Sequence, residues 1–179
     1  MNLRELLIDL SAVTDAELEK KGRELYRTYC LDNDRFGVRL CHDGQKAIFH
    51  ATRFSHAFYD KPSRWSYVKS RDLPDESRLE RVRWIGEVVG GKAPDSECWE
   101  VPGPDGRRRP PNRLYLVWPE NYVVWLEPRT EGGWKFSTAY VKTTGRIRDY
   151  CRGGSKVWAY KETPRDQTGS RDQKPAPPP

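Results

Sequence analysis

The stretch "KAIFHATRFSHAFYD", residues 46–60, holds two of the chain's three histidines, His50 and His56, with Arg53 between them. An imidazole with an ordinary pKa of about 6.5 can give or accept a proton at neutral pH, so each histidine is a candidate general acid or base. The segment therefore predicts a proton-transferring reaction centre. The alternative is an ordinary core or surface segment, because imidazoles often have purely structural roles.

A second candidate group lies in "WKFSTAYV", residues 134–141, which we expect to be a strand. Small apolar residues suit the face beneath helices, so Thr138 and Tyr140 are expected to look outward. Both hydroxyls could hydrogen-bond a phosphate, and Tyr140 could stack on a base. Both residues are also simply favoured in strands. A period of two places three residues on each face: Phe136, Thr138 and Tyr140 on one, and Ser137, Ala139 and Val141 on the other.

The elements that must position these residues follow from local patterns. Apolar spacing and a threonine with acids at its start predict a helix over 14–33, and the His42-Asp43-Gly44 turn predicts a hairpin. Thr52 is expected to cap a short helix starting at Arg53, with Arg53, His56 and Asp60 on its polar side and Phe54, Ala57 and Phe58 on its buried side. Further expected elements are a helix over 74–89 and aromatic, β-branched strands within 112–129, 132–143 and 155–162.

Helices first and strands later predict an α+β fold, in which N-terminal helices pack on one face of a twisted antiparallel sheet of about four to five strands. The opposite face of the sheet is then free to hold a ligand. We expect one domain over 1–162. The remaining residues 163–179, "TPRDQTGSRDQKPAPPP", lack apolar residues, so we expect them to form a disordered proline-rich tail.

The charge balance favours acidic partners. The net charge is +6 and the sequence pI about 9.2, so nucleic acid is the partner class that the composition favours. The predicted helix over 74–89 carries Arg81 and Arg83, and the loop "VPGPDGRRRPPN" carries Arg107, Arg108 and Arg109. These five arginines are candidate nucleic-acid contacts, although a basic loop is also commonly just a solvated one.

Several classes of protein are disfavoured. No apolar run is long enough to span a bilayer and the N-terminus does not resemble a secretory signal, so we expect no membrane partner and a cytoplasmic location. No metal site is expected, since zinc ligands normally lie about two to four residues apart. No cofactor is expected either, because no glycine-rich phosphate loop follows a strand. The four cysteines lie far apart in the sequence: Cys30, Cys41, Cys98 and Cys151.

Four segments in this order resemble the phage-associated branch of the barnase/EndoU/colicin/RelE-like (BECR fold) nuclease superfamily. They are "FHATRFSHAF", "ESRLERVRWI", "LYLVWPENYVVWLE" and "WKFSTAYV", and the resemblance covers roughly residues 37–145. It implies a metal-independent ribonuclease with helices followed by an antiparallel sheet, often a toxin or effector of phages and mobile elements. The resemblance is also compatible with an inhibitory immunity or antitoxin protein as a partner.

Metal-free RNA cleavage uses the 2′-hydroxyl as nucleophile, so it needs a base, an acid and cations that stabilise the phosphorane. The resemblance implies His50 as general acid or base, Arg53 as phosphate clamp, and Thr138 and Tyr140 at the scissile phosphate; His56 is the second histidine candidate. Barnase-type members use a glutamate as base, yet no acidic residue matches that position, and nothing in the sequence singles out Glu127.

Two other functions are compatible with the sequence. One is a non-catalytic nucleic-acid-binding module on the same sheet, which predicts salt-sensitive RNA binding that survives loss of either histidine. The other is an interaction or structural protein of a phage or mobile element, in which the basic surface serves solubility or assembly.

Overall fold

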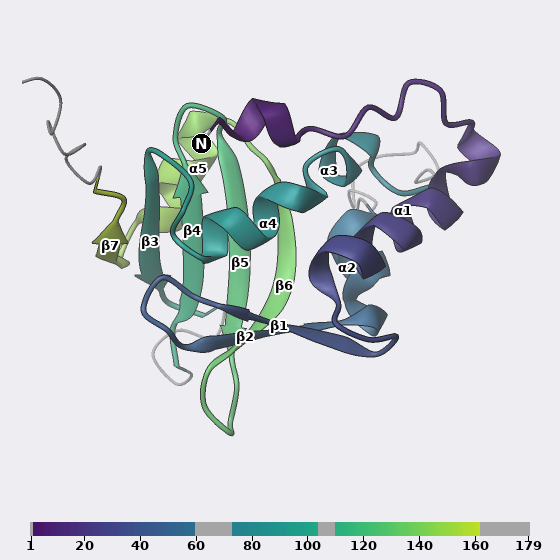
Figure 1. The fold of residues 1–179 in the computed structure, drawn as a ribbon. Coiled ribbons are helices and arrows are strands. Elements are labelled where there is room, and N and C mark those ends of the chain that lie inside the picture. The colour runs from purple at the N-terminus through teal and green to yellow at the C-terminus, as the bar shows by residue number, and fades with distance from the viewer. Residues whose placement is uncertain (1, 60–72, 104–109, 162–179) are drawn as a thin grey trace, which may run out of the picture.

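The structure is a computed structural model that describes residues 2–59, 73–103 and 110–161 (Figure 1). Asp60, Arg107 to Arg109 and the predicted tail therefore lie outside the described residues. The helical elements are η1 Leu3–Leu6, α1 Asp15–Cys30, η2 Ala51–Arg53, α2 Phe54–Phe58, α3 Glu76–Leu79, α4 Val82–Val89 and α5 Thr144–Cys151. The strands are β1 Phe36–Leu40, β2 Lys46–His50, β3 Ser96–Val101, β4 Asn112–Val117, β5 Tyr122–Pro128, β6 Trp134–Val141 and β7 Ser155–Ala159.

Local signals account for the N-terminal elements. Thr14 and Glu17 form a capping box at the start of α1. The Thr14 hydroxyl donates to the Glu17 carboxylate at 2.7 Å, and the same carboxylate accepts from the Thr14 backbone N–H at 3.3 Å. The predicted hairpin forms as β1 and β2. The single helix expected over 74–89 is instead two, α3 and α4, separated at Glu80 and Arg81. Thr52 lies inside η2 and caps no helix, so that expectation was wrong.

The sheet is larger than expected and is mixed. Its seven strands have the order β1-β2-β6-β5-β4-β3-β7. All neighbouring strands pair antiparallel except β2 and β6, which are parallel through Ala47 opposite Trp134 and Ile48 opposite Lys135. The α+β class is confirmed, but the prediction of four to five strands, all antiparallel, was wrong. The parallel pair brings the histidine-bearing strand next to the strand with Thr138 and Tyr140.

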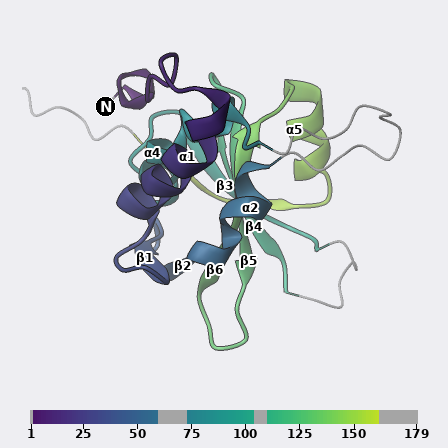
Figure 2. The same ribbon diagram turned by 90° about the vertical axis from the view of Figure 1, so that its right-hand side faces the viewer.

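Two apolar layers lie on the two faces of the sheet. The larger core packs α1, α2 and α4 against one face together with the β1–β2 hairpin. Figure 2 shows α1, α4 and this hairpin on the side of the sheet opposite to α5. On the opposite face, Ile147 of α5 packs against Leu114, Leu116 and Val123. The second face is therefore partly covered by α5, and only the part of it beyond α5 is open as the sequence predicted.

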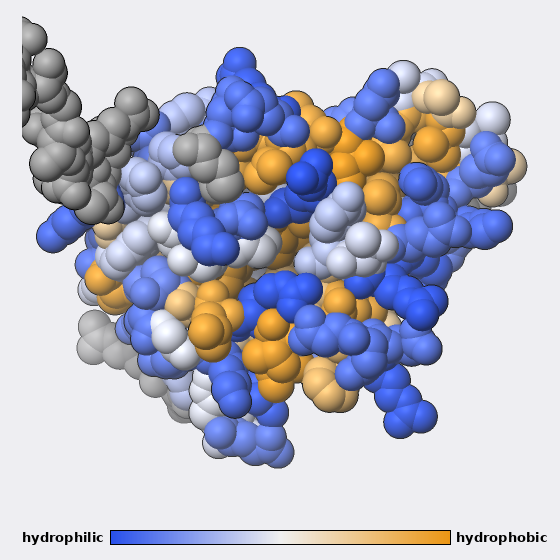
Figure 3. Space-filling view, in the orientation of Figure 1, coloured by the Kyte–Doolittle hydropathy of each residue, from blue (hydrophilic) through white to orange (hydrophobic). Residues whose placement is uncertain are grey.

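The turn of the β1–β2 hairpin is fixed to the sheet by a polar cluster. His42 Nδ1 lies 2.8 Å from the Tyr115 hydroxyl, and its ring stacks on Trp158 with the centroids 4.7 Å apart. Asp43 accepts a 2.7 Å hydrogen bond from the guanidinium of Arg113, which is buried. These contacts hold the turn of the hairpin against the sheet and so fix the start of β2, while His50 lies at its other end. The surface over this hairpin mixes hydrophilic and hydrophobic side chains (Figure 3), and Phe36 and Leu40 of β1 are exposed.

Candidate active site

Three groups converge on the carboxylate of Glu127, near the end of β5. Its Oε1 accepts a 2.7 Å hydrogen bond from the Ser137 hydroxyl. Its Oε2 lies 2.9 Å from Lys135 Nζ and 3.3 Å from Arg53 Nη2. Arg53 is 74 residues away in the sequence, at the end of η2, so the fold and not local structure brings it to this carboxylate. The predicted phosphate clamp is therefore paired with an acid that the sequence did not single out.

A β-bulge explains how Ser137 reaches Glu127. In the β5–β6 ladder Trp125 faces Thr138 and Leu126 faces Phe136, which leaves Ser137 as the extra residue. The bulge reverses the alternation, so Phe136 and Ala139 both lie in the larger core. The prediction that Phe136 shares a face with Thr138 and Tyr140 was therefore wrong. Lys135 faces Glu127 directly across the hairpin.

The surroundings of Glu127 keep it ionised at neutral pH. Partial burial works to raise the pKa of its carboxyl, but hydrogen bonds from Lys135 and Ser137 and the charge of Arg53 outweigh that effect. The pKa consequently lies below the ordinary value for glutamate. Its side chain is 35% exposed, so solvent and a ligand can reach it.

Thr138 and Tyr140 line a hollow beside this carboxylate, on the face away from the larger core. The hollow encloses about 390 Å³, part of it open to solvent. Its lining residues are Asn112, Trp125, Leu126, Glu127, Ser137, Thr138 and Tyr140. Both hydroxyls already have protein partners: Thr138 Oγ1 donates to the Ala57 carbonyl at 3.3 Å, and the Tyr140 oxygen accepts from Trp125 Nε1 at 3.0 Å. Burial raises the pKa of the Tyr140 phenol, so it stays protonated.

Arg78 is a site residue that the sequence did not predict. Its guanidinium lies 5.3 Å from the centre of the Tyr140 ring, and its Nη1 donates to the Ala57 carbonyl at 3.0 Å. Thr138 donates to that same carbonyl, so α3 and β6 meet here. Lys142 adds a second cation, 5.7 Å from the Tyr140 ring. The hollow is therefore bordered by cations, which suits an anionic ligand.

His50 is half-buried at the end of β2, and its backbone carbonyl accepts a 3.2 Å hydrogen bond from the Tyr26 hydroxyl. Strand alternation places its side chain on the same side of β2 as Ile48, because Ala47 and Phe49 point into the core. Ile48 pairs with Lys135, so His50 shares the side of the sheet on which Lys135 meets Glu127. His56 lies on the exposed side of α2.

The two arginines predicted on the helix over 74–89, Arg81 and Arg83, do not join this cluster. Arg81 bonds the Ser77 carbonyl at 2.6 Å and pairs with Glu80, while the Arg83 guanidinium lies 5.4 Å from the centre of the Tyr29 ring. Both belong to the helix layer on the other face of the sheet. The nearby cation is Arg78, one helical turn earlier. Arg107, Arg108 and Arg109 lie outside the described residues.

The signals for the missed residues were of different strength. Glu127 and Lys135 flank the turn at 129–133 at equal distance, so a hairpin register drawn from the sequence pairs them. The hydrogen bond from Ser137 depends on a β-bulge, and no residue type in the sequence predicts a bulge at this position. Arg78 was visible only as one of several arginines on a predicted helix.

The arrangement provides an ionised carboxylate paired with Arg53 and Lys135 and an imidazole on the same side of the sheet. The hollow that Glu127 lines is bordered by two further cations, Arg78 and Lys142. Such a set can bind a phosphodiester and move protons without a metal ion. Among the described residues, no group of three or more histidine, cysteine or acidic side chains is placed to hold a metal.

Comparison of the chain with protein-family models, with curated proteins and with solved structures found no significant match. In the part of the chain that the structure describes, no helix has both the length and the apolar character needed to cross a membrane.

Proposed function

We propose that this protein is a metal-independent RNA endonuclease that cleaves through the 2′-hydroxyl. The observation that carries the proposal is the convergence of Arg53, Lys135 and Ser137 on the ionised Glu127 carboxylate, in the wall of a cation-bordered hollow. The BECR-type resemblance implies His50 as general acid or base, and barnase-type members of that superfamily use a glutamate as base; although the resemblance matches no acid to that position, Glu127 supplies this residue type on the same side of the sheet as His50.

Each residue then has a role that its contacts support. Glu127 accepts the proton of the 2′-hydroxyl, because its lowered pKa keeps it in the basic form. His50, in its protonated form, donates to the leaving 5′-oxygen. Arg53 and Lys135 bind the phosphate oxygens and stabilise the negative charge of the phosphorane. Thr138 and the Tyr140 ring form the wall against which the phosphate and its sugar rest.

A non-catalytic RNA-binding module is the second candidate, and one observation favours it. Glu127 already has three partners and the Tyr140 hydroxyl already accepts from Trp125, as in a cluster whose role is to hold strands together. The same cations and aromatic wall would then bind RNA without cleaving it. The two candidates differ in what happens to the substrate.

The test uses a single-stranded RNA oligonucleotide incubated with the purified protein in excess chelator. Cleavage should yield 2′,3′-cyclic phosphate ends, and an oligonucleotide with 2′-deoxy sugars should stay intact because the nucleophile is missing. Glu127→Gln should slow cleavage about 10²- to 10⁴-fold, the usual contribution of one proton transfer, while RNA binding changes little. His50→Ala should also slow it.

The matched control is Glu131→Gln, which removes an exposed acid from the turn between the same two strands. Its cleavage rate should equal that of the unmodified protein. Intact RNA with undiminished, salt-sensitive binding would reject the nuclease and favour the binding module. Cleavage of DNA, or cleavage abolished by chelator, would also contradict the proposal.

A further inference from the structure

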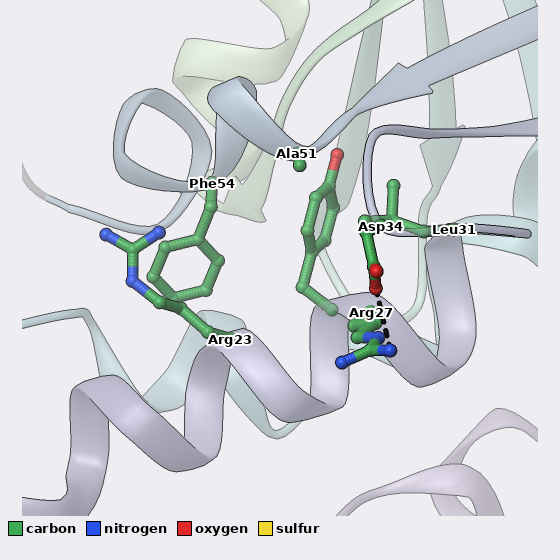
Figure 4. Close-up of a pocket in the computed structure, with 7 residues that line it drawn as sticks. Arg23, Arg27, Leu31, Asp34, Ala51 and Phe54 are labelled. Atoms are coloured by element: carbon green, nitrogen blue, oxygen red, sulfur yellow. Dashed lines mark ion pairs between the residues drawn. The ribbon is translucent and has the colours of Figure 1, made fainter.

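A second hollow lies on the other side of the corner that carries His50 and Arg53, between α1 and η2. It encloses about 520 Å³, including the space at its open mouth. Figure 4 shows Arg23 and Arg27 of α1 on opposite sides of it, with Ala51 and Phe54 contributed by the corner. The residues that line it are Arg23, Tyr26, Arg27, Leu31, Asp34, Ala51 and Phe54.

The inner wall of this hollow is aromatic and rigid. Tyr26 and Phe54 are almost fully buried, with ring centroids 6.0 Å apart. The Arg23 guanidinium lies 4.7 Å from the centre of the Phe54 ring and is held there by hydrogen bonds of 2.9 and 2.8 Å to Glu19. A guanidinium plane beside buried aromatic rings is a surface on which a flat heterocycle stacks.

The outer rim carries a donor and an acceptor that can change partners. Arg27 Nη2 lies 2.6 Å from Asp34 Oδ1, and the two side chains are 69% and 76% exposed. An ion pair so open to water contributes little stability, so replacing it with other hydrogen bonds costs little. A guanidinium next to a carboxylate matches the adjacent acceptors and donors on the edge of a nucleobase.

The hollow is joined to the candidate active site through a few residues of one turn. The Tyr26 hydroxyl at its wall donates to the His50 carbonyl at 3.2 Å. Ala51 faces the hollow, and Arg53, two residues later, reaches Glu127. A chain of nucleotides with one phosphate beside Glu127 would therefore have a neighbouring base close to this hollow.

We propose that the hollow between α1 and η2 is a nucleobase subsite, which stacks one base of the RNA beside the Arg23–Phe54 pair and reads its edge with Arg27 and Asp34. This subsite rests on the proposed RNA endonuclease function, whose active site lies across the same turn. It would give the enzyme a base preference next to the cleaved phosphodiester, as Asp34 accepts from base donors and Arg27 donates to base acceptors.

The test measures binding of the four nucleoside 3′-monophosphates to the full chain by titration calorimetry, for the unmodified protein and for Asp34→Asn. The ranking of the four should change in the variant, and the best ligand should lose about tenfold or more in affinity, the effect of one good pair of base-edge hydrogen bonds. Asp149→Asn is the control: it also removes an exposed acid that pairs with arginines, but on α5. Circular dichroism checks that both variants are folded.

Cleavage of oligonucleotides that differ in one base next to the scissile phosphate separates this proposal from the function on which it rests. If Asp34→Asn cleaves with the same base preference and binds the nucleotides with the same affinities as the unmodified protein and the Asp149→Asn control, the subsite is overturned and the nuclease proposal stands. Nucleotide binding that depends on Asp34, without cleavage by any form, supports the subsite as a nucleotide site and rejects the nuclease. Equal binding of all four nucleotides by the unmodified protein overturns the base-reading role of Arg27 and Asp34.

Discussion

The ion pair between Arg113 and Asp43 should be worth far more to stability than other ion pairs of similar length. The Arg113 side chain is 6% exposed, and its Nη2 lies 2.7 Å from Asp43 Oδ2. Its Nε and Nη1 are buried without a hydrogen-bond partner among the described residues, so Asp43 is the main group that compensates its charge. Asp43→Asn keeps the shape of the side chain and removes that compensation.

The expected loss can be worked out from burial. Removing one partner of a fully buried pair costs about 3–5 kcal/mol. The Asp43 side chain is 27% exposed and Glu100 lies 3.8 Å from the same guanidinium nitrogen, so we expect a smaller loss of about 2–3 kcal/mol. Arg129 and Glu131 are closer, at 2.6 Å, but Glu131 is 77% exposed, and such a pair contributes only about 0–1 kcal/mol. Burial, and not distance, decides the difference.

Urea unfolding of Asp43→Asn and Glu131→Gln measures both losses under the same conditions. The effect of Asp43→Asn should also depend on pH. Burial works to raise the pKa of Asp43, but the hydrogen bonds from Arg113 and from the Gln45 backbone N–H, together with the charge of Arg113, lower the pKa below its ordinary value of 3.8. The stabilisation by Asp43 is therefore complete above pH 3.8 and is lost as the pH falls through the lower pKa of the folded state. The free energies of unfolding of the unmodified protein and of Asp43→Asn should therefore converge in acid. The reasoning would be refuted if Asp43→Asn and Glu131→Gln lost equal amounts of unfolding free energy. It would also be refuted if the difference between Asp43→Asn and the unmodified protein did not narrow in acid.

Three further changes test other parts of the structure. Gly37→Ala should lower the free energy of unfolding by about 3 kcal/mol, measured in urea, because an added Cβ would lie 2.2 Å from the backbone oxygen of Cys30. Burial lowers the pKa of His42 below its ordinary 6.5, so the unfolded chain binds the proton more readily than the folded chain. The stability of the fold should therefore decrease as the pH drops below 6.5. In thermal melts, His42→Gln should show a weaker dependence of stability on pH. Ser137→Ala should raise the pKa of Glu127, followed by carboxyl NMR titration, and cost about 1 kcal/mol because a hydrogen bond to a charged group is lost; an unchanged pKa would show that the bond is not made in solution.

Features set by neighbouring residues could be predicted from the sequence. The capping box of Thr14 and Glu17 starts α1 where the sequence places it, and the Asp43-Gly44 turn joins β1 and β2 as expected. Each signal lies within a few residues of the element that it specifies, so no tertiary contact is needed to recognise it. The expected burial of Phe54 is of the same kind.

Features that depend on distant segments could not be predicted. The parallel pairing of β2 with β6 and the bulge at Ser137 each require a strand from elsewhere in the chain, and the bulge alone moved Phe136 into the core. β3 was missed because "SECWEV" is short and mixes polar with apolar residues. α5 was missed because Ile147 is its only buried residue within the described chain.

The ion pairs around Glu127 should contribute little to the stability of the fold, which favours a functional over a purely structural role for this cluster. All three side chains are partly exposed, Arg53 by 25%, Lys135 by 31% and Glu127 by 35%, so their ion pairs should add less stability than the Arg113–Asp43 pair, in which Arg113 is only 6% exposed. By contrast, the buried Arg113–Asp43 pair already fixes the hairpin that ends at His50. Replacing Glu127 should therefore leave the fold almost as stable as before, so a large loss of RNA cleavage in Glu127→Gln would report on chemistry and not on unfolding. Because the same cations remain in that variant, any loss of cleavage would also be separable from a loss of phosphate binding.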